Sequence, residues 1–408
     1  MTWKYYINIM DIMIKYICPD NWIKYDPIAI SQSLVDAKVA ILSLQTIPYQ
    51  RDWVESLQEL ELKREVAGTS RIEGADFTET ELDAAMKETA DELLTRSQRQ
   101  AHTALKAYKW IIRIPDDNPI DEKLIKAIHR IIVTGADDDH CPPGKIRQQD
   151  ENVNFGSPRH RGAPGGLECE QGLARFTKAL QREYREHDPI IQALATHYHF
   201  AAMHPFLDGN GRTARVLEAL LLQRAGLRDT CFIAMSNYYY DEKTAYLKVL
   251  SECRSNNHDL TSFLNFALKG VEIQIKRLLS VVRKEISKEL YRGIAYNLFK
   301  RLISKKKRVL AKRQLNILHL LLKHDDGIFL KDVIAQTENF YNSLGSPRKA
   351  LIRDLNDLIG LRAIKNIITP KNGSLLIVDL DWPTKITETE FFEGTKKLPK
   401  GKGYSFLR

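Results

Sequence analysis

The chain is built around one short run, His204-Pro205-Phe206-Leu207-Asp208-Gly209-Asn210-Gly211-Arg212-Thr213-Ala214-Arg215. Apolar spacing predicts a helix before it, with Asp188 as cap and Pro189 at the first helical position. Pro205 cannot continue that helix, so His204 is expected to end it. A second helix is predicted over 213–225. Backbone amides in a glycine-rich turn at a helix N-terminus bind anions, so the run predicts a phosphate-binding turn between two helices.

The charged residues of this run suit phosphate chemistry. Arg212 and Arg215 are three apart and share a helix face. Both lie in the first turn, where the helix dipole already favours anions, so they call for a polyphosphate or for an internal carboxylate in its place. Asp208 is a hard oxygen ligand suited to Mg²⁺. His204 is the natural general base.

The run resembles the motif of the Fic family, H-x-F-x-[DE]-G-N-G-R-x-x-R, and every fixed position is present. The resemblance implies transfer of AMP from ATP to a Ser, Thr or Tyr hydroxyl of a protein, with Mg²⁺. It implies that His204 is the base and that Asp208 holds the metal. The implied ATP and phosphate contacts are Asp208, Gly209, Asn210, Gly211, Arg212, Thr213, Ala214 and Arg215, with Arg212 on the β- and γ-phosphates and Arg215 on the γ-phosphate.

A second motif lies upstream, where Thr69 precedes Glu73 and Gly74. It resembles the inhibitory motif [S/T]-x-x-x-E-[G/N] of Fic proteins with an N-terminal inhibitory helix. The resemblance implies that Glu73 pairs with Arg215 and excludes the productive ATP pose; a bidentate pair shielded from water would be strong. Two alternatives stay open. Gly74 could simply end a helix beside an exposed Glu73, or Glu73 could serve removal of AMP.

The segment from Pro142 to Arg147 resembles the turn that enters the Fic β-hairpin, or flap. We expect the hairpin over 147–158, with Val153, Asn154, Phe155 and Gly156 near the nucleotide and the target peptide added as a strand. Residues 148–151 are more polar than the usual pattern. A flexible loop is expected over 159–166.

Aromatic and histidine side chains outside the motif are harder to assign. Tyr246 resembles the first of an aromatic pair that contacts adenine or ribose, and a core position is the equal alternative. Arg254 stands where relatives often carry Asn. His129 and His197 are expected in the core.

The expected fold is mainly α: a Fic, or Fido, helical core with a β-hairpin flap, followed by a winged helix-turn-helix domain. The expected parts are an N-terminal helical region (1–118) containing the inhibitory motif (69–74), the catalytic core (119–270), a connecting helix (271–311), a winged-helix-like domain (312–383) and a polar tail (384–408). A winged helix ends many bacterial Fic proteins, so we expect a bacterial chain.

The partners of the winged-helix-like domain stay open. Lys349 and Arg353 on its third helix could contact DNA phosphates. Asp354 and Asp357 on the same helix oppose DNA, which slightly favours protein interaction or dimerisation. A net charge of +9 adds only weak support for nucleic acid.

Composition bears on location. No run of about 18 apolar residues is apparent, so we expect no membrane span. Five scattered cysteines form no metal-binding spacing, and their odd number favours a reducing, cytoplasmic setting. The N-terminus lacks the layout of a signal peptide.

Two other classes of function compete with AMP transfer: a different group transfer and DNA-binding regulation. Relatives acting as kinases replace the second glycine of the turn by lysine, and Gly211 argues against that chemistry. Phosphocholine transfer stays open. The rival from another class is a winged-helix DNA-binding regulator whose Fic core only senses nucleotide; His204 argues against it, because sensing needs no base. Self-modification and a homodimer are further expectations.

Overall fold

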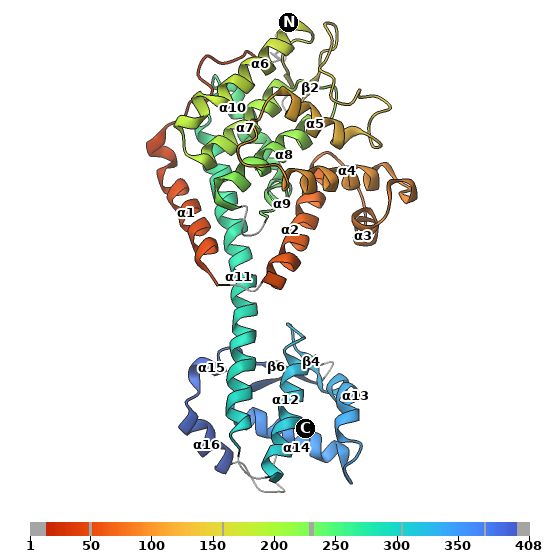
Figure 1. Ribbon diagram of the computed structural model, residues 1–408, viewed down its shortest axis with the longest axis vertical. Coiled ribbons are helices and arrows are strands. Elements are labelled where there is room, and N and C mark those ends of the chain that lie inside the picture. The colour runs from red at the N-terminus through yellow and green to blue at the C-terminus, as the bar shows by residue number, and fades with distance from the viewer. Residues whose placement is uncertain are drawn as a thin grey trace, which may run out of the picture. The chain divides into compact units, whose positions relative to one another are not determined.

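The computed structural model describes residues 14–48, 51–156, 159–227, 232–302, 305–370 and 373–397. The chain forms two compact units, Met1–Leu279 (unit 1) and Ser280–Arg408 (unit 2). Both are mainly helical (Figure 1), as predicted. The division falls inside α11 (Thr261–Lys300), within the stretch expected to be a connecting helix.

Unit 1 is a helical core in which α7 and α8 pack side by side (Figure 1). Its helices before α11 are α1 (Pro27–Thr46), α2 (Arg51–Ile72), α3 (Glu79–Lys87), η1 (Ala90–Glu92), α4 (Arg96–Ile111), α5 (Glu122–Val133), α6 (Leu167–Gln181), η2 (Glu183–Glu186), α7 (Pro189–Met203), α8 (Asn210–Leu222), η3 (Gln223–Leu227), α9 (Met235–Asp241) and α10 (Lys243–Ser255). Asp188 caps α7 and Pro189 begins it, as predicted. The motif therefore joins two buried core helices.

Helix α2 lies along α9 and continues through Thr69 to Ile72. Gly68 permits the close approach: a Cβ there would overlap the backbone of Ser236 and Asn237. Lys243 donates a hydrogen bond to the carbonyl of Ile72, 2.9 Å away, at the end of the helix. The end of α2 is thus fixed beside the motif.

A small sheet covers one side of the motif. Strands β2 (Asn154–Phe155) and β3 (His160–Arg161) pair antiparallel, and β1 (Ile14–Lys15) adds to β3 in parallel. The predicted bounds of the hairpin, 147–158, were wrong, because its second strand lies where a loop was expected. The start of that stretch is held in an irregular path by the side chain of Arg147, which donates to the carbonyls of Glu151 and Ala163 at 2.5 and 2.6 Å.

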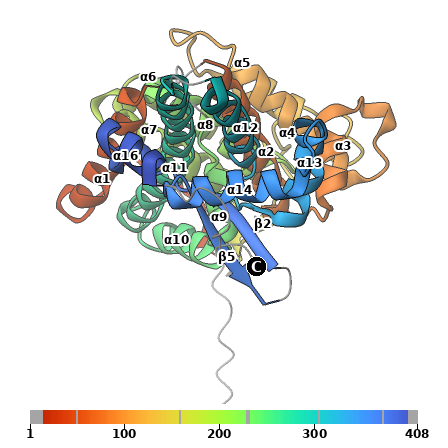
Figure 2. The same ribbon diagram turned by 90° about the horizontal axis from the view of Figure 1, so that it is seen from below.

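Unit 2 contains a three-stranded antiparallel sheet in the order β4-β6-β5. Helices α13 and α14 contact each other and pack against β6 and β5, respectively (Figure 2). Its elements after α11 are α12 (Lys305–Leu321), β4 (Ile328–Phe329), α13 (Leu330–Tyr341), α14 (Pro347–Gly360), β5 (Ile364–Thr369), β6 (Gly373–Val378), α15 (Trp382–Lys385) and α16 (Glu388–Lys397). The assignment to the winged-helix class stays a prediction, and the first two residues of the expected Lys371-Asn372-Gly373 turn lie outside the described residues.

Two expectations for unit 2 were wrong. Asp354 and Asp357 do not face outward: Asp354 accepts hydrogen bonds from Arg313 and Tyr341, both at 2.9 Å, and Asp357 accepts one from Gln314. Both carboxylates therefore accept hydrogen bonds inside unit 2. The polar tail also does not begin at 384, because Phe391 on α16 is fully buried against the unit's aromatic core.

Helix α1 is long and apolar enough to cross a membrane by length and composition, and no other helix of the described ranges is. This differs from the sequence expectation, which required an unbroken apolar run. Core helices of soluble proteins can have the same length and composition. Polar side chains of α1 form hydrogen bonds with other parts of unit 1: Ser33 with Asn265 at 2.9 Å and Lys38 with Asp188 at 2.7 Å.

Candidate active site

The motif loop is closed by one amide side chain. His204 ends α7 in the left-handed region (φ 56°), and Gly209 precedes α8 with φ 73°. The side chain of Asn210 accepts from the amide of Phe206 at 2.9 Å and donates to its carbonyl at 2.8 Å. The sequence reasoning placed Asn210 among the phosphate contacts, but its side chain is consumed in shaping the loop.

His204 is held as a neutral base. Its Nδ1–H donates to the carbonyl of Ala201 at 3.1 Å, which leaves Nε2 with the lone pair. Burial lowers the pKa of His204 to about 4, and cationic Arg147 acts in the same direction. Arg147 also donates to the carbonyl of His204 at 2.9 Å, so the buried arginine of the flap turn orients the histidine backbone.

Flap residue Phe155 lies on the histidine. Its ring stacks on the imidazole of His204, with the centroids 4.0 Å apart and the planes within 10°. The guanidinium of Arg254 lies 4.7 Å from the centroid of the Phe155 ring, within cation–π distance. The expected flap positions Val153, Asn154 and Gly156 surround Phe155 in sequence, but it is Phe155 that contacts the base.

The first turn of α8 presents free backbone amides. In the described part of the chain, no acceptor partners the N–H groups of residues 210–212. They form the positive end of a helix, which binds anions. A Cβ at Gly211 would overlap Oε1 of Glu73, so the carboxylate of Glu73 already lies over this turn.

Arg215 joins the inhibitory motif to the turn. It donates to Oγ1 of Thr69 at 2.8 Å and to Oε1 of Glu73 at 2.5 Å. Burial alone would raise the pKa of Glu73, but Arg215 and Arg212 outweigh it and hold that pKa below its usual range. Gly74 does end the turn with φ 92°, yet Glu73 is ion-paired rather than merely exposed.

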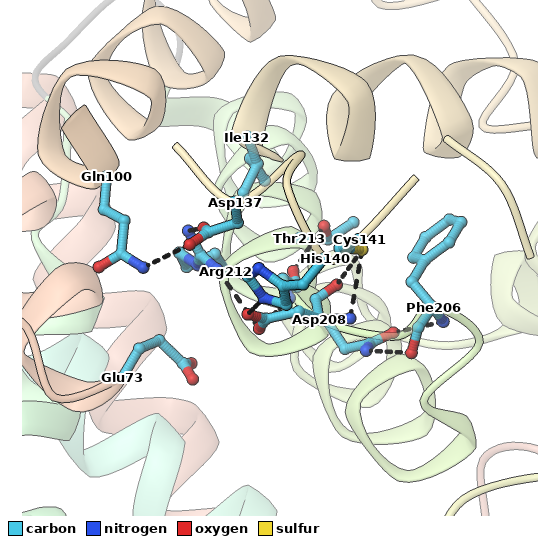
Figure 3. A network of polar contacts seen from close by, with 12 residues as sticks. Glu73, Gln100, Ile132, Asp137, His140, Cys141, Phe206, Asp208, Arg212 and Thr213 are labelled. Atoms are coloured by element: carbon cyan, nitrogen blue, oxygen red, sulfur yellow. Dashed lines mark hydrogen bonds and ion pairs between the residues drawn. The ribbon is translucent and has the colours of Figure 1, made fainter. Parts of the chain in front are cut away.

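Arg212 is held by a carboxylate that the sequence reasoning missed. It donates to Oδ2 of Asp137 at 2.6 Å, and Gln100 donates to Oδ1 of the same residue at 2.9 Å (Figure 3). Arg96 also donates to this Oδ1, at 2.8 Å. The side chain of Asp137 is fully buried. Both of its oxygens are therefore consumed by donors, and it orients Arg212.

Asp208 offers one carboxylate oxygen to a cation. Oδ1 accepts from the amide of Gly209 at 2.5 Å, and Oδ2 faces the ring of His140 (Figure 3). The backbone of Asp208 is clamped, because its carbonyl accepts from His129 at 3.0 Å and its N–H lies 3.3 Å from the sulfur of Cys141. A carboxylate so fixed fits a hard divalent ion such as Mg²⁺.

Three predicted contacts lie away from the cradle. Tyr246 is 3% exposed, stacks on Tyr239 and bonds through its hydroxyl to His197, 2.8 Å away, so the core alternative was right. Ala214 is fully buried, and the hydroxyl of Thr213 bonds back to the carbonyl of Gly209. These residues support the motif helix, and their side chains do not face its open end.

The sequence reasoning also passed over Asp137, His140 and Cys141. All three come from the run Asp137-Asp138-Asp139-His140-Cys141, which directly precedes the flap turn. Such a concentration of acids with a histidine, just upstream of the implied flap turn, was the available signal.

Comparisons with known proteins agree with this geometry. Residues 119–222 match the Fic/DOC family. A protein adenylyltransferase Fic of Drosophila willistoni is 33% identical over 107 residues, covering 24% of this chain and 22% of that protein. Protein adenylyltransferase fic-1 of Caenorhabditis elegans is 35% identical over 97 residues, covering 24% and 17%. The matched region thus spans about a fifth of the curated relatives' length.

Solved structures share the fold. A Fic family protein from Desulfovibrio desulfuricans G20 aligns with a TM-score of 0.55 and 18% identity, covering 88% of this chain and 98% of that one. Fic-1 of C. elegans aligns with a TM-score of 0.53 and 19% identity, covering 64% and 75%. Residues 119–222 thus form a domain that matches the Fic/DOC family.

Proposed function

We propose that the chain is a protein adenylyltransferase, which transfers AMP from ATP to a Ser, Thr or Tyr hydroxyl of a protein. The observation that carries the proposal is the carboxylate of Glu73 over the first turn of α8, paired with Arg215. An anion is thus held at the free amides beside a neutral histidine. The names of the curated relatives support the same reaction.

The step needs a base and positioning. The phosphates of ATP lie along the amides of α8, and the acceptor oxygen attacks the α-phosphorus in line. The new P–O bond forms as the bond to the bridging oxygen breaks, and pyrophosphate leaves. The hydroxyl proton passes to Nε2 of His204, which is unprotonated at neutral pH because its pKa is about 4. Phe155 must first leave the imidazole face.

Asp208 would hold Mg²⁺ through Oδ2. The metal would neutralise charge on the phosphates when bound. The clamp of His129 and Cys141 on the backbone of Asp208 fixes where that oxygen points.

Glu73 keeps the protein largely inactive. Its carboxylate occupies both the open turn and Arg215, so the terminal phosphates cannot settle there. The same carboxylate lies near enough to the cradle to orient a water for the reverse removal of AMP. Which direction dominates follows from how often Glu73 leaves Arg215.

The test is intact-mass analysis after incubation with ATP and Mg²⁺. Glu73→Gly gains whole AMP units on itself, and wild type gains far fewer. Because a general base contributes about 10²–10⁴-fold, His204→Ala in the Glu73→Gly background loses the modification. Equal incorporation by all three proteins refutes the proposal. A gain of phosphocholine from its nucleotide donor, without AMP, would replace it with the alternative transfer.

A second function is proposed for unit 2, which is contact with DNA through α14. Lys349 and Arg353 are exposed there, and the acids once counted against DNA are consumed internally. Protein contact or a homodimer is the competing role.

We also propose a cytoplasmic location, which the free thiols of Cys18, Cys141, Cys169 and Cys253 support; Cys231 lies outside the described residues.

A further inference from the structure

The segment between α5 and the flap turn places a histidine against the free oxygen of Asp208. Nε2 of His140 lies 2.9 Å from Oδ2 of Asp208. Two ligand atoms at right angles around an ion, each about 2.1 Å from it, lie about 3 Å apart. The pair therefore has the spacing of two neighbouring ligands of one octahedral ion.

The other ring nitrogen of His140 is occupied. Nδ1 lies 2.7 Å from Oδ1 of Asp139, so that carboxylate accepts the Nδ1 proton. A carboxylate behind a histidine fixes the ring, the arrangement common behind metal-bound histidines. Without an ion, Nε2–H donates to Oδ2 of Asp208, and a bound ion would take the place of that proton. Asp139 thus supports the ring of His140, and Nε2 of that ring faces Oδ2 of Asp208 at the proposed cation position.

Asp137 is close to these groups but is not a ligand. Its two oxygens accept from Arg96, Gln100 and Arg212. The guanidinium of Arg96 also lies 3.7 Å from Oδ2 of Asp208 and 3.4 Å from Nε2 of His140, and a 2.6 Å ion pair with Asp137 holds it there.

The local charge leaves room for a cation. Two guanidinium groups (Arg96 and Arg212) face three carboxylates (Asp137, Asp139 and Asp208), so these five side chains carry one net negative charge.

We propose that His140 is a nitrogen ligand of the divalent ion held by Asp208, supported by Asp139, and that it shifts the preference of this site from Mg²⁺ toward Mn²⁺. Imidazole suits transition metals, whereas Mg²⁺ prefers oxygen. The inference rests on the proposed function, because the remaining ligands are phosphate oxygens of the nucleotide and water.

The test uses Mn²⁺ as the spectroscopic probe, in the full-length Glu73→Gly protein with α,β-methylene-ATP, which cannot release AMP. Electron spin-echo modulation of the bound Mn²⁺ should show coupling to an imidazole nitrogen. The coupling should disappear in His140→Gln and persist in His324→Gln, which removes a histidine from unit 2. Asp139→Asn should keep the coupling but weaken Mn²⁺ affinity about tenfold.

The outcomes separate the two claims. Bound Mn²⁺ without nitrogen coupling overturns the role of His140 and leaves nucleotide binding intact; His140 is then only an ion-pair partner of Asp208. The role also fails if the coupling persists in His140→Gln. Absence of any Mn²⁺–nucleotide complex on the Glu73→Gly protein overturns the proposed function together with this inference.

Discussion

Two arginines of α8 form guanidinium–carboxylate pairs that differ in how firmly the carboxylate is held. Arg212 meets Asp137, whose side chain is fully buried and bound by two further donors. Arg215 meets Glu73, whose side chain is 32% exposed and stands just past the end of α2. The acid tied by several donors fixes an arginine, and the acid on a helix end can be withdrawn. Equal charges thus serve structure in one pair and, under the proposed function, inhibition in the other.

Removing each acid in turn tests this comparison with the largest expected effect. Asp137→Ala strands the buried guanidinium of Arg212 and should cost about 3–5 kcal/mol of unfolding free energy. Glu73→Ala should cost clearly less, because water or an anion can reach Arg215 from the open side. Urea unfolding of unit 1 measures both. Equal losses would show that the two acids are mounted alike.

Glu65 lies on α2, the helix that ends just before Glu73, and should make the stability of the protein depend on pH. Burial raises the pKa of Glu65 to about 7, although Ser236 and Tyr108 donate to it. The folded state therefore keeps a proton that the unfolded state releases above its ordinary pKa of 4.5. Glu65 by itself should therefore lower stability by up to about 3 kcal/mol as pH rises from about 4.5 to about 7. Buried His204, whose pKa is lowered to about 4, acts in the opposite direction over the same interval.

The measurement is the unfolding free energy at about pH 5 and about pH 8. Between these two pH values the unfolding free energy of Glu65→Gln should rise relative to that of wild type, because the substitution removes the contribution of Glu65. Glu59→Gln, at an exposed position of the same helix, should keep the wild-type dependence. The same pH dependence in wild type and Glu65→Gln would contradict the assignment.

A smaller effect should follow from crowding α2. Gly68→Ala forces the helix away from Ser236 and Asn237, an overpacking worth about 1–3 kcal/mol. The shift should loosen Glu73 from Arg215 and raise AMP incorporation on the order of tenfold, since 1.4 kcal/mol is a factor of ten. Gly293→Ala, where a Cβ meets nothing within 4 Å, is the control. Unchanged incorporation would mean that α2 position does not govern release.

Unit 2 contains a third pair, Arg313 with the fully buried Asp354, and removing its acid should cost as much unfolding free energy as removing Asp137.

If α14 binds DNA, replacing Lys349 and Arg353 by alanine should reduce the salt dependence of binding by about 0.9 per lost phosphate contact. Fluorescence anisotropy with duplex DNA at several salt concentrations measures this. Lys385→Ala is the control. No binding by wild type would favour the protein-contact role.

The sequence was informative where chemistry demands a residue order. The loop between His204 and Arg215 and the cap at Asp188 follow from local spacing. The Glu73–Arg215 pair follows from the resemblance of the upstream motif to the inhibitory motif of Fic proteins. Contacts set by the tertiary path were missed. Asp137 reaches Arg212 only because α5 packs against α8, and Tyr246 turns inward to meet His197. The short strands were misplaced because Arg147 dictates their path through distant carbonyls.

The closure of the motif loop by Asn210 also bears on chemical ageing. In a flexible peptide, an asparagine followed by glycine readily cyclises to a succinimide, because the glycine nitrogen attacks the side-chain carboxamide. Here both carboxamide atoms are engaged with Phe206, and Asn210 is 1% exposed. Folding therefore shields this Asn-Gly step from deamidation, whereas prolonged unfolding would leave an aspartate whose charge repels any nucleotide.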